Sequence, residues 1–156
     1  MKQVHERIFV GNDADCRVAQ RADLTIAHGC KTCHQAELKY FGKLLPTDIN
    51  YLAVERDNNL FMNLIDPPVP LFKLESFVKF LQWSGAHYAA GESMLIHCNQ
   101  GQSRAPSLAL VFLSKKLGVI GNGSYARARA DFESLYPTYA PGKGIETFLT
   151  QHWQEI

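Results

Sequence analysis

The residues best suited to chemistry stand together at positions 97 to 104, which read His-Cys-Asn-Gln-Gly-Gln-Ser-Arg. One thiol, Cys98, and one guanidinium, Arg104, flank five intervening residues. An apolar run, Met94-Leu95-Ile96, precedes them and a longer apolar run follows, so we expect a strand, a short loop and a helix N-terminus. Such a loop leaves several backbone N–H groups free. The segment therefore predicts an anion-binding loop with a cysteine at its base.

The types of residue in this loop suit a phosphate group. Gly101 allows the backbone to approach an anion without a Cβ in the way. Arg104 adds a planar, two-pronged donor, and together with the helix N-terminus it favours the thiolate form of Cys98. The predicted phosphate-binding residues are Asn99, Gln100, Gly101, Gln102, Ser103 and Arg104. The simpler interpretation is a buried, inert thiol beside an unrelated arginine.

This arrangement resembles the signature loop, His-Cys-x5-Arg, of the cysteine-based protein tyrosine phosphatases, and the chain looks most like a small dual-specificity phosphatase domain. The resemblance implies a phosphoprotein phosphatase that acts through a cysteinyl-phosphate intermediate, without a metal or another cofactor. Phosphotyrosine is the expected substrate, with phosphoserine and phosphothreonine as further candidates. Cys98 would be the nucleophile, and Arg104 would hold the phosphate.

The resemblance also implies a general acid on an upstream loop. Asp66, in Leu64-Ile65-Asp66-Pro67-Pro68, follows an apolar strand and opens a proline-stiffened loop, as the family's acid does. Asp-Pro is also a common turn opener, so a purely structural role is the alternative. Asp48 and Asp57 are nearby rivals, and Asp57 stands before the strand. We expect His97 to support the loop by bonding backbone, and not to act as a base.

The chain departs from the family at two positions. The residue after the signature arginine is usually Ser or Thr, whose hydroxyl assists the departure of the sulfur, whereas here it is Ala105. Ser103 or Ser107 could compensate, although neither stands at the matching position. Gly142 occupies a place near the C-terminus where the family often has Asn. The departure at Ala105 bears on turnover more than on phosphate binding.

Two other functions, and one other branch of cysteine-based phosphatases, compete with a dual-specificity protein phosphatase. One is a catalytically impaired module that only binds phosphate groups, motivated by Ala105. Another is a phosphatase for phosphoinositides or RNA 5′ ends. Such members usually carry Lys or Arg in or near the loop, whereas Asn99, Gln100 and Gln102 are neutral. The low-molecular-weight phosphatases place their cysteine near the N-terminus, which argues against that branch.

A second short motif, Cys30-Lys31-Thr32-Cys33-His34, has the spacing of covalent haem attachment. That chemistry belongs to exported proteins, and no export signal is evident before it. A zinc site of His28, Cys30, Cys33 and His34, or a redox pair of the two thiols, is also possible from the spacing. The simplest interpretation is a polar loop with two reduced thiols.

Composition predicts an ordinary globular domain over residues 1–156. Hydrophobic residues make up 46% and charged residues 20% of the chain, and the formal net charge of +1 gives no reason to expect a nucleic-acid partner. No apolar run approaches the length of a membrane span, so we expect a cytoplasmic protein that does not contact membranes. The expected partner is a phosphorylated protein or peptide, and the oligomeric state stays open, with a monomer plausible.

Strand and helix patterns alternate along the chain and predict an α/β fold. Expected strands lie at 8–10, 24–27, 51–54, 60–64 and 91–97. Expected helices lie at 13–21, around 35–40, from 71 to about 85 or a turn later, and at 103–117, 124–136 and 144–153. We expect a largely parallel central sheet of about four to five strands flanked by helices. The signature loop should then join a central strand to a buried helix.

Overall fold

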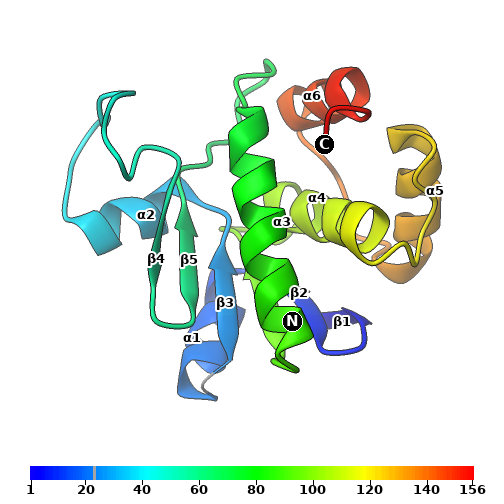
Figure 1. The fold of residues 1–156 in the computed structure, drawn as a ribbon, viewed down its shortest axis with the longest axis horizontal. Coiled ribbons are helices and arrows are strands. Elements are labelled where there is room, and N and C mark those ends of the chain that lie inside the picture. The colour runs from blue at the N-terminus through cyan, green and yellow to red at the C-terminus, as the bar shows by residue number, and fades with distance from the viewer. Residues whose placement is uncertain (23) are drawn as a thin grey trace.

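The computed structural model describes residues 1–22 and 24–156. Within these residues six strands form one sheet, in the order β1-β2-β6-β3-β5-β4 (Figure 1). The strands are β1 Lys2–His5, β2 Ile8–Gly11, β3 Thr25–His28, β4 Ala53–Arg56, β5 Asn59–Met62 and β6 Met94–His97. The helices are α1 Asp13–Arg21, α2 Lys31–Leu38, α3 Leu74–Ala89, α4 Arg104–Val111, α5 Tyr125–Leu135 and α6 Lys143–His152, with a π-helical turn η1 Phe112–Lys116 that continues α4. No helix in the described ranges is both long and apolar enough to cross a membrane.

The sheet confirms the predicted α/β fold. Its four inner strands, β2, β6, β3 and β5, are parallel, and each outer strand pairs antiparallel with its neighbour. The described residues thus contain six strands where about four to five were expected. The additional strand, β1, has the sequence Lys-Gln-Val-His with mostly exposed side chains, so it carries no alternating pattern that could predict it.

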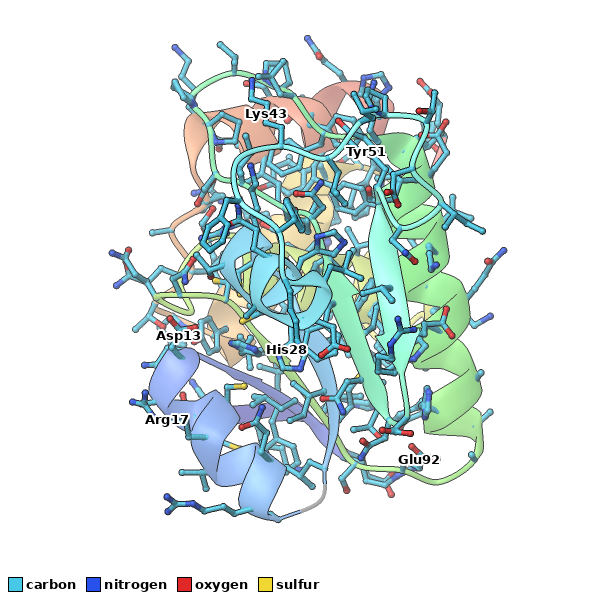
Figure 2. The ribbon with its side chains drawn as sticks, turned by 90° about the vertical axis from the view of Figure 1, so that its left-hand side faces the viewer. Asp13, Arg17, His28, Lys43, Tyr51 and Glu92 are labelled. Atoms are coloured by element: carbon cyan, nitrogen blue, oxygen red, sulfur yellow. The ribbon has the colours of Figure 1, made fainter. Side chains whose placement is uncertain are left out.

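Helices cover both faces of the sheet. Ile26 of β3 and Leu95 of β6 point toward α1, where they form a small core with Cys16 and Ala19. Side chains one position along each strand point to the other face and into the main core, which α3 to α6 cover. Figure 2 shows α1 and α3 on opposite sides of the strands. The signature strand β6 is therefore buried on both faces.

Two helices begin elsewhere than expected. The structure starts α2 at Lys31, not near 35, and the Lys31 N–H donates to Leu64 O at 2.8 Å. The helix expected from Leu71 starts at Leu74, and the Leu71 side chain is exposed. The helix expected at 124–136 is confirmed, with the Ser124 side chain accepting from Arg127 N at its N-cap.

The carboxyl ends of the parallel strands meet at one edge. Gly11, His28 and His97 are register partners at the ends of β2, β3 and β6. The loop after β6 therefore lies between the segments that follow β2 and β3. This is the edge at which open α/β sheets bind their ligands.

Candidate active site

The loop between β6 and α4 turns its carbonyl groups outward. Its carbonyl oxygens accept from three donors outside it: Asp13 N to Asn99 O at 3.4 Å, Tyr136 Oη to Gly101 O at 2.9 Å and Ala140 N to Gln102 O at 2.9 Å. The N–H groups of residues 99–103 donate to no protein atom in the part of the chain that the structure describes. The loop therefore presents a row of free donors between Cys98 and Arg104, as an oxyanion site requires.

The backbone conformation and the close packing at the centre of the loop require a glycine at position 101. Its φ of +71° is unfavourable for residues with a side chain. A Cβ at this position would also lie 2.8 Å from Gly11 O. The sequence predicted a glycine that lets an anion approach, and the structure adds that the glycine lets the loop pack on the end of β2.

Cys98 lies at the base of the loop and is 1% exposed. Its N–H donates to Gly11 O at 3.4 Å. The hydroxyls that could compensate for Ala105 have other partners: Ser103 Oγ accepts from Gly142 N at 2.9 Å, and Ser107 Oγ bonds Tyr139 Oη at 2.8 Å. Ala105 itself is fully buried. Among the described residues, no hydroxyl is hydrogen-bonded to the Cys98 sulfur.

Arg104 is held by two of its three nitrogens. Nη1 donates to Leu64 O at 3.0 Å, and Nη2 donates to Asn99 Oδ1 at 2.8 Å. Nε is buried and has no hydrogen-bond partner among the described residues. These two bonds fix the guanidinium in orientation and leave its Nε–H unpaired.

The structure brings Asp66 to this site. Its Oδ2 lies 3.9 Å from Arg104 Nε, and its side chain is 27% exposed. A Cβ on Gly142 would overlap the Asp66 carboxylate, so the glycine leaves room for it. The rivals lie elsewhere. Asp57 occupies the β4–β5 turn, at the opposite edge of the sheet, and Asp48 Oδ1 accepts from Asn50 N in a surface loop.

His97 is fully buried, and it has a side-chain partner that was not predicted. Its Nε2 bonds His28 Nδ1 at 2.8 Å. Burial lowers the pKa of His97 below its ordinary value and lowers that of His28 to about 4, so both rings are neutral at pH 7. His97 Nδ1 lies 3.6 Å from Asp13 Oδ1 and has no hydrogen bond to the described residues.

Several supporting contacts were not predicted. Asn99 Nδ2 donates to Asp13 Oδ2 and to Thr32 Oγ1, both at 3.1 Å, and so links the loop to α1 and α2. Tyr136 holds the loop from the end of α5. The Gly11-Asn12 turn was visible in the sequence, but its position under the signature loop follows only from the pairing of β2 with β6.

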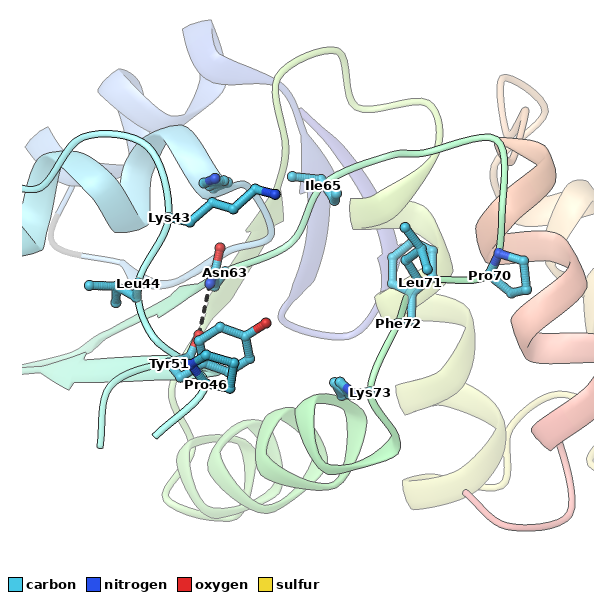
Figure 3. A pocket seen from close by; sticks show the side chains of 11 residues that line it. Lys43, Leu44, Pro46, Tyr51, Asn63, Ile65, Pro70, Leu71, Phe72 and Lys73 are labelled. Atoms are coloured by element: carbon cyan, nitrogen blue, oxygen red, sulfur yellow. Dashed lines mark hydrogen bonds between the residues drawn. The ribbon is translucent and has the colours of Figure 1, made fainter. Parts of the chain in front are cut away.

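A groove with a volume of about 500 Å³ lies next to the acid loop (Figure 3). Its apolar wall includes Ile65, Leu71 and Phe72, which follow β5. The same groove carries three lysines, Lys31, Lys43 and Lys73. Lys31 N and Arg104 Nη1 both donate to Leu64 O, so the groove and the signature loop share a backbone anchor.

Comparison with known proteins gives structural matches only. Neither a protein-family model nor a curated protein sequence matches the chain. Human DUSP28 superposes with a TM-score of 0.67 at 19% identity, over 98% of this chain and 91% of that one. The human tyrosine phosphatase-like serine/threonine/tyrosine-interacting protein superposes with a TM-score of 0.65 at 17% identity, over 99% of this chain and 93% of that one. Tk-PTP in its active form superposes with a TM-score of 0.62 at 16% identity, over 99% of this chain and 97% of that one. At these identities the likeness concerns the fold, and it confirms what the signature motif predicted: the chain has the fold of the small dual-specificity phosphatases within the cysteine-based protein tyrosine phosphatases.

Proposed function

We propose that the protein is a cysteine-dependent phosphatase that hydrolyses phosphotyrosine in proteins, with phosphoserine and phosphothreonine as further substrates. The observation that carries this proposal is the row of free N–H groups at residues 99–103, between a buried thiol and a fixed guanidinium. Preorganised donors of this kind stabilise charge on phosphoryl oxygens as it develops.

The proposed reaction has two steps. The Cys98 thiolate attacks phosphorus, the bond to the ester oxygen breaks, and Asp66 gives that oxygen its proton. Water then attacks the cysteinyl phosphate and loses a proton to the Asp66 carboxylate. The sulfur–phosphorus bond breaks, which releases inorganic phosphate and restores the thiolate. In both steps Arg104 and the loop N–H groups hold the non-bridging oxygens.

The groove beside Asp66 supports an acidic peptide as the carrier of the phosphate. Its apolar wall can bind a side chain next to the phosphorylated residue, and its three lysines favour neighbouring acidic groups. A phosphoinositide is the alternative. The uncharged side chains within the signature loop argue against a phosphoinositide substrate. Lys31, Lys43 and Lys73, however, supply positive charge from outside that loop.

A substrate panel tests the proposal. It compares phosphotyrosine, phosphoserine and phosphothreonine peptides, each with acidic or neutral flanking residues, with a phosphoinositide. We expect repeated turnover of the phosphotyrosine peptides, faster with acidic flanks, and inhibition by vanadate. Turnover of the phosphoinositide alone would contradict a protein substrate.

The second candidate is a phosphate-binding module that does not turn over. It is favoured by Ala105, since no hydroxyl within the described chain is bonded to the Cys98 sulfur. A single burst of product, one equivalent per protein and then no further release, would support this candidate. Steady release of many equivalents would reject it.

A further inference from the structure

The two thiols of the Cys-x-x-Cys motif face the signature strand. Cys30 is the N-cap residue of α2, Cys33 lies in its first turn, and their sulfurs are 3.0 Å apart. Both sulfurs and a ring nitrogen of His97 lie within 4.8 Å of one another. The histidines expected to join these cysteines do not: His34 bonds Tyr40 Oη and Asn50 O, and His28 bonds His97 Nε2.

A chain of hydrogen bonds determines which nitrogen of His97 carries the proton. It starts at Leu24 O, which can only accept, so Asn58 Nδ2 donates to it at 3.0 Å. Asn59 Nδ2 then donates to Asn58 Oδ1, and Asn59 Oδ1 accepts from His28 Nε2. His28 Nδ1 therefore carries a lone pair and accepts from His97 Nε2. The neutral His97 ring is left with a lone pair on Nδ1.

That lone pair is buried and has no donor among the described residues. Nδ1 lies 3.6 Å from Asp13 Oδ1, and a nitrogen of the same ring lies within 4.8 Å of both sulfurs. An arrangement of acceptors without a donor is unfavourable unless a cation lies between them.

We propose that Cys30, Cys33 and His97 Nδ1 bind a zinc ion, with Asp13 as the fourth ligand. Zinc prefers four ligands of this kind, and a zinc-bound histidine usually donates its other N–H to a fixed acceptor, as His97 does to His28. Tetrahedral bond lengths place two thiolates about 3.8 Å apart and a nitrogen and an oxygen about 3.3 Å apart. The Asp13–His97 distance is already close to this. The Asp13 carboxylate is not within 4.8 Å of both sulfurs, so its half-exposed side chain has to turn toward them, and Cys33, which is only partly buried, has to move by less than about 1 Å.

The site also has an access path and an outer shell. The Asp13 side chain is 49% exposed, so an ion can reach the cluster from solvent. Its second oxygen accepts from Asn99 Nδ2, and Asn99 Oδ1 accepts from Arg104. Figure 2 labels Asp13, at the start of α1, and His28, at the end of β3. Zinc would join α1, α2 and β6 around the signature loop, as a structural ion that takes no part in phosphoryl transfer.

Metal titration of the full chain tests the proposal, independently of any phosphatase activity. The reduced, metal-free protein is titrated with Zn²⁺ against a chromogenic chelator and, separately, with Co²⁺. We expect one ion per chain and the charge-transfer absorption of a thiolate–cobalt site. Zinc should also raise the melting temperature, because it binds the folded chain. Failure of the wild type to bind one equivalent would overturn the proposal.

Variants identify the ligands. Cys33→Ser should weaken zinc binding at least tenfold while its thermal melt still shows a folded chain, and Cys30→Ser should do the same if it folds. Cys16→Ser and Cys98→Ser should both keep the site, since neither sulfur belongs to it. Loss of the ion in Cys98→Ser would place the metal on the nucleophile and overturn the proposal. So would a Cys30–Cys33 disulfide that persists in reductant.

Discussion

At the scale of single residues, the candidate site depends on which atoms are left without a partner. Arg104 Nε and the N–H groups of residues 99–103 have none in the described chain, whereas the carbonyls of the loop are bonded from outside. The unpaired donors therefore all belong to the segment from Asn99 to Arg104, and each reacting group can be tested separately.

Cys98→Ser should abolish turnover and keep phosphopeptide binding, because the loop donors and Arg104 remain. Hydrolysis of an aryl phosphate and calorimetric binding of a phosphotyrosine peptide measure the two properties. Cys16→Ser, which changes another buried thiol, is the matched control and should keep both. A Cys98→Ser variant that hydrolyses at the wild-type rate would show that another residue is the nucleophile.

Asp66→Asn should slow phosphopeptide hydrolysis by about 10²–10⁴-fold, the usual contribution of general acid catalysis. Esters with good leaving groups need little protonation and should lose much less. Rates across a series of aryl phosphates measure this difference. Asp57→Asn, at the opposite edge of the sheet, should behave as wild type. Equal losses for all leaving groups would leave Asp66 with a structural role only.

Ala105→Ser should raise turnover about tenfold if it lowers the barrier of the second step by about 1.4 kcal/mol. A hydrogen bond to a charged group contributes about 1.5–3 kcal/mol, less the cost of burying the hydroxyl. Stopped-flow measurements should show a burst of product in the wild type that shrinks in the variant. Absence of both the burst and the gain would mean that hydrolysis of the cysteinyl phosphate does not limit the enzyme.

At the scale of elements, the acid loop is positioned by α6. A Cβ on Gly144, in the first turn of α6, would overlap the carbonyl oxygens of Pro67 and Val69. These are backbone atoms, so the segment after Asp66 would have to move.

Gly144→Ala should therefore cost about 1–3 kcal/mol in stability, as overpacking usually does. It should also slow phosphopeptides more than esters with good leaving groups, because Asp66 moves with the loop. Denaturant unfolding and the leaving-group series measure both effects. Gly123→Ala, where a Cβ meets nothing within 4 Å, is the matched control. Identical behaviour of the two variants would contradict this role for Gly144.

Elements that local pattern determines were predictable from the sequence, and elements that distant contacts determine were not. The β6 strand, the loop and α4 follow from apolar runs around residues 97–104. The start of α2 depends on the bond from Lys31 N to Leu64 O, which joins segments far apart in the chain. The His28–His97 pair likewise follows from the register of β3 with β6. That register cannot be predicted from the local sequence of either strand.

At the scale of the whole molecule, the two faces of the sheet are unequal. The core under α1 comprises Cys16, Ala19, Ile26 and Leu95, whereas the core under α3 to α6 contains most of the buried aromatic side chains. The free energy of local opening follows the apolar contacts that an element makes.

Amides of α1 should therefore exchange with solvent through a local opening of lower free energy than those of α4 and β6. Native-state hydrogen exchange in low denaturant measures this. Zinc bound through Asp13 should raise the opening free energy of α1 toward that of α4 and β6, since Asp13 is the first residue of α1. Protection of α1 equal to that of β6 in the metal-free protein would contradict the prediction.

The outward bonds of the signature loop have a consequence for synthesis on the ribosome. Two of the three outside donors, Tyr136 and Ala140, and the Gly142 N–H that bonds Ser103, come well after Cys98 in the chain. A nascent chain that has emerged only as far as residue 135 contains the thiol and the guanidinium but not the segment that holds the loop open. The reactive cysteine is therefore translated before its binding site can form, and the site is completed only when the segment from 136 to 142 folds against the loop.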